Sequence, residues 1–280
     1  MKKTNLVKEL GSKVYLRYSR ANVLNFLQYA RSVEFDPDSI VESKDFRLAN
    51  KMLRSKLPSF YAARHSKFKS LADFFGGRPV VDLASSVSAA RRDFSVKPAS
   101  WFSVEDAYLL IEEMKKMGAT SILDPFHGWG ARYIASAMSG VDYIGIDANQ
   151  LLHEELLALC PGATLFCADS FTFDFSSLDV DAVFTCPPYW RCEDYGYRVK
   201  TWSYSKFVSN LADLFERLSL KVKVQFVSIE DFTLDRKYGF EKDFCDAIQA
   251  RGILVEEVSY KSMKRSFGGD KSLKVFILRR

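Results

Sequence analysis

The chain has 280 residues, of which 48% are hydrophobic and 14% aromatic, so it holds enough apolar material for a sizeable core. No apolar run approaches the ~20 residues that a membrane span needs, and the Met1-Lys2-Lys3 start lacks the apolar segment of a signal peptide. The five cysteines form no CxxC pair and the three histidines are dispersed. A cytoplasmic protein with reduced thiols, no metal site and no membrane partner is expected.

Basic residues are concentrated in the N-terminal part of the chain. Residues 1–100 hold 19 lysines and arginines against 9 acids, whereas residues 101–280 hold 21 against 26. This asymmetry predicts that the N-terminal region contacts an anionic partner such as nucleic acid. The alternative is a helix pair with a solvated basic face and its aromatic residues in the core. The candidate phosphate contacts are Arg47, Lys51, Arg54, Lys56, Arg64, Lys67 and Lys69.

The N-terminal region is expected to be mostly helical. Apolar residues at three- and four-residue spacing predict helices over residues 22–31, 43–56 and 71–75. A boundary is expected at residues 96–100, where a proline precedes a new helix start. Residues 1–100 would then form a basic extension and residues 101–280 a second domain, opening with a helix over residues 103–117.

Short apolar runs then alternate with helical patterns. Strands are predicted over residues 121–123, 141–147, 163–168 and 180–185, and three of them end in an acid. A single acid at a strand end is usually a helix cap, but three in succession predict one ligand-binding edge of a parallel sheet. The remaining pattern predicts helices over residues 203–218 and 240–251, and strands over residues 222–229, 253–260 and 273–278. A turn at Gly268-Gly269 makes the last strand antiparallel. We therefore expect an α/β, Rossmann-like sheet of seven strands.

The first of these strands leads into a glycine turn. Asp124-Pro125 ends the strand, and Gly128 and Gly130 allow a tight turn and close approach of a ligand before a helix over residues 131–138. We expect Asp124 to have little structural use and to pair with a ligand cation such as an amino-acid ammonium.

The acids of the next two strands suggest the rest of a nucleoside site. Asp147 follows the glycine turn at the spacing where a carboxylate accepts both hydroxyls of a ribose. Asp169 and Ser170 end the third strand, where they could read an adenine amino group.

Two motifs resemble those of the S-adenosylmethionine-dependent amino methyltransferases of DNA. Phe126-His127-Gly128-Trp129-Gly130 matches the FxGxG cofactor motif of that family. Thr185-Cys186-Pro187-Pro188-Tyr189-Trp190, followed by Asp194-Tyr195-Gly196, is similar to the TSPPYW and Asp-Tyr-Gly sequences of the N4-cytosine branch. Cys186 stands where serine is usual. The resemblance covers residues 101–280 and says nothing about residues 1–100.

The resemblance implies a seven-stranded methyltransferase sheet and the cofactor S-adenosylmethionine, which becomes S-adenosylhomocysteine. The implied cofactor residues are Asp124, Pro125, Phe126, Gly128, Gly130, Asp147, Asp169 and Ser170. A segment at residues 97–102 would close over the methionine end of the cofactor.

The resemblance also implies the chemistry. Two acceptors take the hydrogens of a base amine and localise its lone pair, and these would be the Cys186 side chain and the Pro187 carbonyl. Tyr189 would stack on a base rotated out of the duplex. The implied catalytic set is Cys186, Pro187, Pro188, Tyr189 and Trp190, with N4-cytosine favoured over N6-adenine as the target.

Two other functions remain open beside a DNA amino methyltransferase. One is an enzyme of the same fold acting on RNA, on protein, or on a pyrimidine carbon through Cys186. The other is a nucleic-acid-binding subunit without turnover. DNA is the expected partner, and a homodimer or a separate specificity subunit is also left open.

Overall fold

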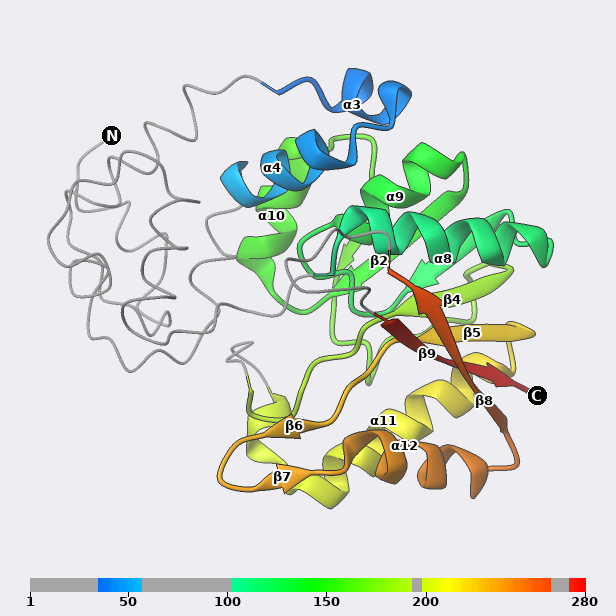
Figure 1. Cartoon of the computed structure of the whole chain (residues 1–280). Helices are drawn as coiled ribbons and strands as arrows, with labels where there is room; N and C mark the ends of the chain where they lie inside the picture. The colour runs from blue at the N-terminus through cyan, green and yellow to red at the C-terminus, as the bar shows by residue number, and fades with distance from the viewer. Residues whose placement is uncertain (1–34, 57–101, 193–197, 263–271) are drawn as a thin grey trace, which may run out of the picture.

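A computed structural model describes residues 35–56, 102–192, 198–262 and 272–280. Its centre is a seven-stranded sheet in the order β3-β2-β1-β4-β5-β9-β8 (Figure 1). The strands are β1 (Ser121–Asp124), β2 (Asp142–Asp147), β3 (Thr164–Cys167), β4 (Ala182–Thr185), β5 (Val224–Val227), β8 (Leu254–Lys261) and β9 (Ser272–Arg279).

The strand directions confirm the expected Rossmann-like sheet of seven strands. Strands β1 to β5 are parallel, and β9 runs antiparallel to both of its neighbours, β5 and β8. Strand β1 lies between β2 and β4, so the chain moves outward from β1 to β3 and then crosses back to β4. Such a reversal of strand order opens a crevice at the carboxyl ends of the two central strands, where ligands of α/β proteins bind.

Helices cover both faces of the sheet. One layer contains α8 (Val104–Lys116), α9 (Ala131–Ser139) and α10 (Gln150–Leu159), and the other contains α11 (Tyr204–Ser219) and α12 (Phe240–Gln249). Because successive side chains of a strand point to opposite faces, Ile122 packs in the α8 and α9 core while Leu123 packs in the α11 and α12 core. Helices α11 and α12 confirm the helices expected over residues 203–218 and 240–251.

The helix expected over residues 43–56 is confirmed from Phe46 onward, but it begins three residues later than expected and a separate helix precedes it. The chain forms α3 (Pro37–Ser43) and α4 (Phe46–Lys56), separated by Lys44 in a left-handed conformation with φ of 52°. The Asp45 carboxylate then accepts the Leu48 amide at 2.8 Å, which starts the second helix.

Helix α4 packs into the α8 and α9 core through Ala49, Met52 and Leu53, all of them fully buried. The Asn50 side chain joins α4 to α8, because it accepts the Val104 amide and donates to Glu105 Oε2 at 2.6 Å. The expected helices over residues 22–31 and 71–75, and the boundary at residues 96–100, lie outside the described residues. The division into two domains stays a prediction.

Two short elements follow β4 and β5 without a counterpart in the sequence analysis. They are η1 (Arg198–Thr201) and the hairpin of β6 (Phe232–Thr233) and β7 (Lys237–Tyr238). Within the described ranges, no helix is long and apolar enough to cross a membrane. The same ranges contain no group of three or more histidine, cysteine or acidic side chains arranged to hold a metal ion.

Candidate active site

The two sequence motifs lie next to each other because their strands are neighbours in the sheet. Ile122 pairs with Ala182 and Leu123 with Val183, so β1 and β4 end at the same edge. The FHGWG turn (residues 126–130) follows β1 at this edge, and the CPPYW segment (residues 186–190) follows β4 there. The sheet thus brings together the predicted cofactor and catalytic segments.

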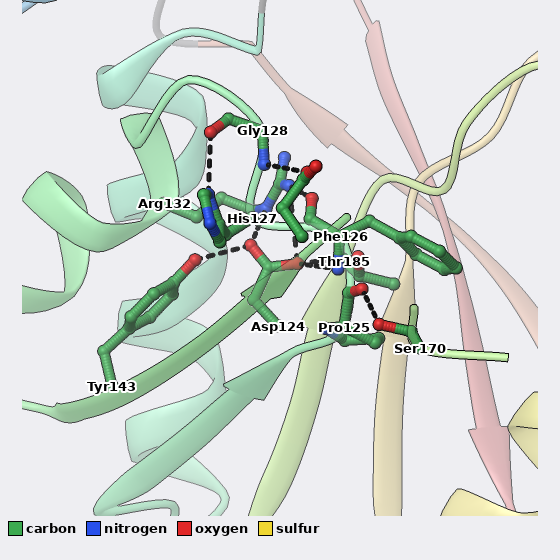
Figure 2. Close-up of polar contacts among 10 residues, drawn as sticks. Asp124, Pro125, Phe126, His127, Gly128, Arg132, Tyr143, Ser170 and Thr185 are labelled. Atoms are coloured by element: carbon green, nitrogen blue, oxygen red, sulfur yellow. Dashed lines mark hydrogen bonds and ion pairs between the residues drawn. The ribbon is translucent and has the colours of Figure 1, made fainter. Parts of the chain in front are cut away.

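Asp124, the last residue of β1, is fully buried and has many partners (Figure 2). Its Oδ2 accepts Arg132 Nε at 2.5 Å and the Tyr143 hydroxyl at 2.6 Å. Its Oδ1 accepts the Thr185 hydroxyl at 2.7 Å, the Phe126 amide at 3.1 Å and Arg132 Nη2 at 3.4 Å. The expectation that this carboxylate has little structural use is wrong, because it joins β1, β2, β4 and α9.

Arg132 is the positive partner of Asp124 and is 5% exposed. Burial alone would lower the pKa of its guanidinium, but the carboxylate of Asp124, with smaller effects of Tyr143 and Cys186, raises that pKa. The guanidinium also lies over the rings of Phe102 and Phe184, at 5.7 and 5.9 Å from their centroids. Arg132 therefore stays charged at the centre of the site.

Tyr143 is the neutral partner of the same carboxylate. Burial, and then the nearby charge of Asp124, raises the pKa of Tyr143 well above its usual value. Its hydroxyl therefore keeps its proton and remains a hydrogen-bond donor to Asp124.

The glycine turn between β1 and α9 needs glycine at both motif positions. Gly128 has φ of 54° and Gly130 φ of 79°, in the left-handed region that disfavours side chains. A Cβ added to Gly130 would lie 2.6 Å from Leu156 Cδ1, whereas one on Gly128 would have no contact closer than 3.8 Å. A side chain at Gly130 would therefore clash with Leu156, whereas one at Gly128 would make only ordinary van der Waals contacts.

Asp147, at the end of β2, faces the glycine turn. Its Oδ2 accepts the Gly128 amide at 3.2 Å and its Oδ1 accepts the Asn149 amide at 2.9 Å. The residue is half-buried, and each carboxylate oxygen keeps a second lone pair for a ligand hydroxyl.

The segment after β3 contains the other predicted cofactor residues. Asp169 is half-buried and caps its own turn by accepting the Phe171 amide at 3.0 Å. Ser170 is buried and donates its hydroxyl to the Pro125 carbonyl, while the Phe126 ring packs against Phe171 at 5.6 Å. Pro125 and Ser170 thus join the two segments, and a contact of Asp169 with adenine stays a prediction.

The catalytic motif begins where β4 ends. Cys186 is half-buried and Pro187 and Pro188 are buried. The Tyr189 hydroxyl accepts the Glu230 amide at 3.0 Å, and Trp190 donates from Nε1 to the Trp202 carbonyl at 3.0 Å.

An aromatic cluster surrounds the last two motif residues. Tyr189 packs edge-on against Phe232 and Phe240, and Trp190 packs against Tyr204 and Tyr238. The hairpin of β6 and β7 thus packs against the motif through Phe232 and Tyr238. Stacking of Tyr189 on a base stays a prediction.

Arg132, Tyr143 and Thr185 belong to the site but were not expected from the sequence. A charged residue inside the otherwise apolar run of α9 was the available signal for Arg132, since a buried cation needs a partner. Tyr143 and Thr185 carry no such signal, because they lie 19 and 61 residues from Asp124.

The predicted phosphate contacts are only partly within the described chain. Arg47 and Lys51 are exposed on the outer face of α4. The side chains of Arg54 and Lys56, and all of Arg64, Lys67 and Lys69, lie outside the described residues, as does the Asp194-Tyr195-Gly196 sequence. Of the segment expected to close over the cofactor, only Phe102 is described.

Comparison with known proteins gives a match only among solved structures, since no family model and no curated protein matches the chain. A TehB-like SAM-dependent methyltransferase from Corynebacterium glutamicum is 19% identical, with 71% of this chain and 100% of that chain covered and a TM-score of 0.43. Magnesium protoporphyrin IX methyltransferase from Synechocystis, with bound SAM, is 12% identical, with 89% and 99% covered and a TM-score of 0.43. A putative RNA methyltransferase from Pyrococcus horikoshii is 13% identical, with 63% and 82% covered and a TM-score of 0.40.

Proposed function

We propose that the chain is an S-adenosylmethionine-dependent DNA methyltransferase that modifies an exocyclic base amine, with N4 of cytosine favoured over N6 of adenine. The observation that carries the proposal is the pairing of β1 with β4, which brings the FHGWG and CPPYW segments to one edge. The hydrogen bond of Thr185, which precedes Cys186, to Asp124 strengthens this link.

The residues at this edge fit the proposed cofactor. The turn has a left-handed Gly128, which leaves the backbone without a side chain there, as close approach of a ligand requires. The Asp147 carboxylate has lone pairs left for the ribose hydroxyls, and Asp169 is half-exposed for the base. When bound, S-adenosylmethionine supplies an electrophilic methyl group on its sulfonium.

The chain's own residues would prepare the acceptor. An exocyclic base amine is a poor nucleophile because its lone pair is delocalised into the ring. The Cys186 sulfur and the Pro187 carbonyl would accept its two hydrogens, while Tyr189 would hold the base plane. Trp190 and the buried prolines keep these groups in place, so that catalysis comes from positioning.

A first test is cofactor binding by calorimetry. The unmutated protein should bind S-adenosylmethionine, and Asp147→Ala should weaken binding by about 1–3 kcal/mol because it removes a charge-assisted hydrogen bond to the ribose. Asp142→Ala is the matched control, since this exposed acid opens the same strand that Asp147 ends. Absence of binding to the unmutated protein would contradict the proposal.

The acceptor is identified by incubating the protein with labelled S-adenosylmethionine and DNA, followed by mass spectrometry of the nucleosides. N4-methylcytosine or N6-methyladenine is expected, and Cys186→Ser should keep or raise the rate because a hydroxyl is the better acceptor. Cys245→Ser, at a half-buried thiol on α12, is the control. Production of 5-methylcytosine together with an inactive Cys186→Ser would instead support attack by the thiolate on a pyrimidine carbon.

We further propose DNA as the partner of α4. Its exposed Arg47 and Lys51 support the proposal, and removing one phosphate-binding cation should reduce the salt slope of DNA binding by about 1. Arg47→Gln with Lys51→Gln is therefore expected to weaken binding to every DNA sequence. Lys242→Gln on α12, in the opposite helix layer, should leave the slope unchanged. An unchanged slope in the α4 variant would remove this surface from the DNA interface.

A further inference from the structure

Arg132 is a buried cation at a place where a helix normally attracts anions. It is the second residue of α9, whose first N–H groups have no acceptor within the helix and whose dipole is positive at this end. The Asp124 carboxylate offsets the charge of Arg132, so that the pair is neutral. The helix dipole is left to favour a further negative group.

Two of the three guanidinium nitrogens of Arg132 donate hydrogen bonds within the described chain. Nε donates to Asp124, and Nη2 donates to Asp124 and to the Phe126 carbonyl. No group of the described chain accepts from Nη1. Unlike the neighbouring His127 Nε2, Nη1 is not fully enclosed. It therefore has part of the 5% exposure of Arg132.

The surroundings place this nitrogen at the glycine turn. Figure 2 shows the Arg132 guanidinium between Asp124 and the Gly128 loop. A Cβ on Gly128 would lie 3.9 Å from Arg132 Nη2, so the guanidinium borders the glycine turn. Because Nε and Nη2 both donate to Asp124, Nη1 is the nitrogen of the planar guanidinium that is turned away from this carboxylate.

Asp124 cannot take the ligand cation that the sequence suggested. Its two oxygens have about four lone-pair sites, and they already accept five hydrogen bonds from four residues with no exposed surface. The polar group that remains available at this end of the site is the Arg132 donor.

We infer that Arg132 Nη1, together with the N-terminus of α9, binds the carboxylate at the amino-acid end of the cofactor. This inference rests on the proposed function, since it presumes that S-adenosylmethionine occupies the turn. Asp124 then acts as a positioning residue that holds the guanidinium, and Tyr143 and Thr185 hold Asp124.

The test compares two ligands by calorimetry, S-adenosylmethionine and its decarboxylated analogue, which differ only in this carboxylate. The unmutated protein should bind the analogue about 10- to 100-fold more weakly, as expected for the loss of a hydrogen bond between charged groups. In Arg132→Lys, whose single nitrogen is needed by Asp124, the ratio should fall to about threefold or less. Tyr133→Phe is the matched control, because it removes a hydroxyl from the next residue of α9 without removing a partner of Asp124 or Arg132, and it should keep the ratio.

Folding of the variants is measured in parallel, since an unpaired Asp124 would destabilise the core. Asp124→Asn combined with Arg132→Met removes both charges at once and should also lose the discrimination. Equal binding of the two ligands to the unmutated protein would overturn the inference and leave the proposed function intact. A ratio that persists in both Arg132 variants would also overturn it, whereas failure to bind either ligand would overturn the proposed function itself.

Discussion

Tyr143 and Tyr133 form an edge-to-face pair in which only Tyr143 has a hydrogen-bonded hydroxyl among the described residues. We predict that Tyr143→Phe lowers the free energy of unfolding by about 1.5–3 kcal/mol, because a buried carboxylate loses a donor. Tyr133→Phe, in the other ring of the pair, should change it by about 0.5 kcal/mol or less. Denaturant unfolding of both variants measures the difference. Equal losses would mean that the bond to Asp124 contributes nothing beyond packing.

Gly130 and Gly140 flank α9 and allow backbone conformation to be separated from space. Both have positive φ, at 79° and 64°, but an added Cβ meets Leu156 only at Gly130. Gly130→Ala should therefore destabilise the protein by about 1–3 kcal/mol more than Gly140→Ala and should weaken cofactor binding. Thermal unfolding and calorimetry test this. Equal effects of the two substitutions would contradict the contact with Leu156.

At the scale of elements, Arg217 of α11 holds the segment that follows β3. Its guanidinium donates to the carbonyls of Ser170, Phe171 and Phe173 at 2.9 to 3.1 Å and lies over the ring of Phe175. One side chain thus fixes the turn that presents Asp169.

Arg217→Lys should loosen this turn, because one ammonium cannot replace a planar fork that reaches three carbonyls. We expect faster hydrogen exchange at the Phe173 amide, which bonds Asp169, and cofactor binding about three- to tenfold weaker. The control is Arg251→Lys, which alters a second arginine clamp between α11 and α12. It should affect stability but not affinity. Unchanged exchange at Phe173 in Arg217→Lys would contradict the role of the clamp.

The sequence predicts all seven strands of the sheet, although their burial differs. The residues of β4 are buried throughout, so an apolar run marks that strand, whereas β3 and β8 are mostly exposed. The break between α3 and α4 was missed because it depends on the conformation of Lys44, which no periodicity reveals. The hairpin of β6 and β7 was missed because two-residue strands carry no pattern.

For the site, the sequence locates the edge but not the contacts. Three acids at strand ends predict where a ligand binds, yet the number of partners of Asp124 depends on residues brought in by β2 and β4. The expected ammonium contact failed for this reason. The charge on a strand end is visible in a sequence, whereas the donors that surround it belong to tertiary structure.

At the scale of the whole molecule, His153, which lies beside His127 of the glycine turn, makes stability depend on pH. The rings of His127 and His153 lie 6.5 Å apart, and neither His127 Nε2 nor His153 Nδ1 has a partner in the described chain. Burial, and then the proximity of His127, lowers the pKa of His153, against the smaller opposing effects of Glu154 and Asp147.

The His153 pKa is lower in the folded state than in the unfolded chain, where it has its usual value of about 6.5. At pH values below about 6.5 the unfolded chain therefore binds more protons than the folded one. Stability should therefore be full above that pH and decrease as the pH falls through it toward the lower folded pKa. His153→Gln should flatten this part of the stability curve. Denaturant unfolding between about pH 5.5 and pH 7.5 measures it, and a constant difference between variant and unmutated protein would contradict the prediction.

The link between Thr185 and Asp124 also has a consequence for how the chain is made. Asp124 and Arg132 are synthesised eight residues apart, but Thr185 follows 61 residues after Asp124. Until β4 has left the ribosome, β1 is an edge strand and the carboxylate lacks one of its donors. A nascent chain that ends before β4 thus lacks the central strand pair and one of the four residues that bond Asp124. A ligand that binds at this edge would therefore stabilise chains whose synthesis has passed β4 more than shorter ones.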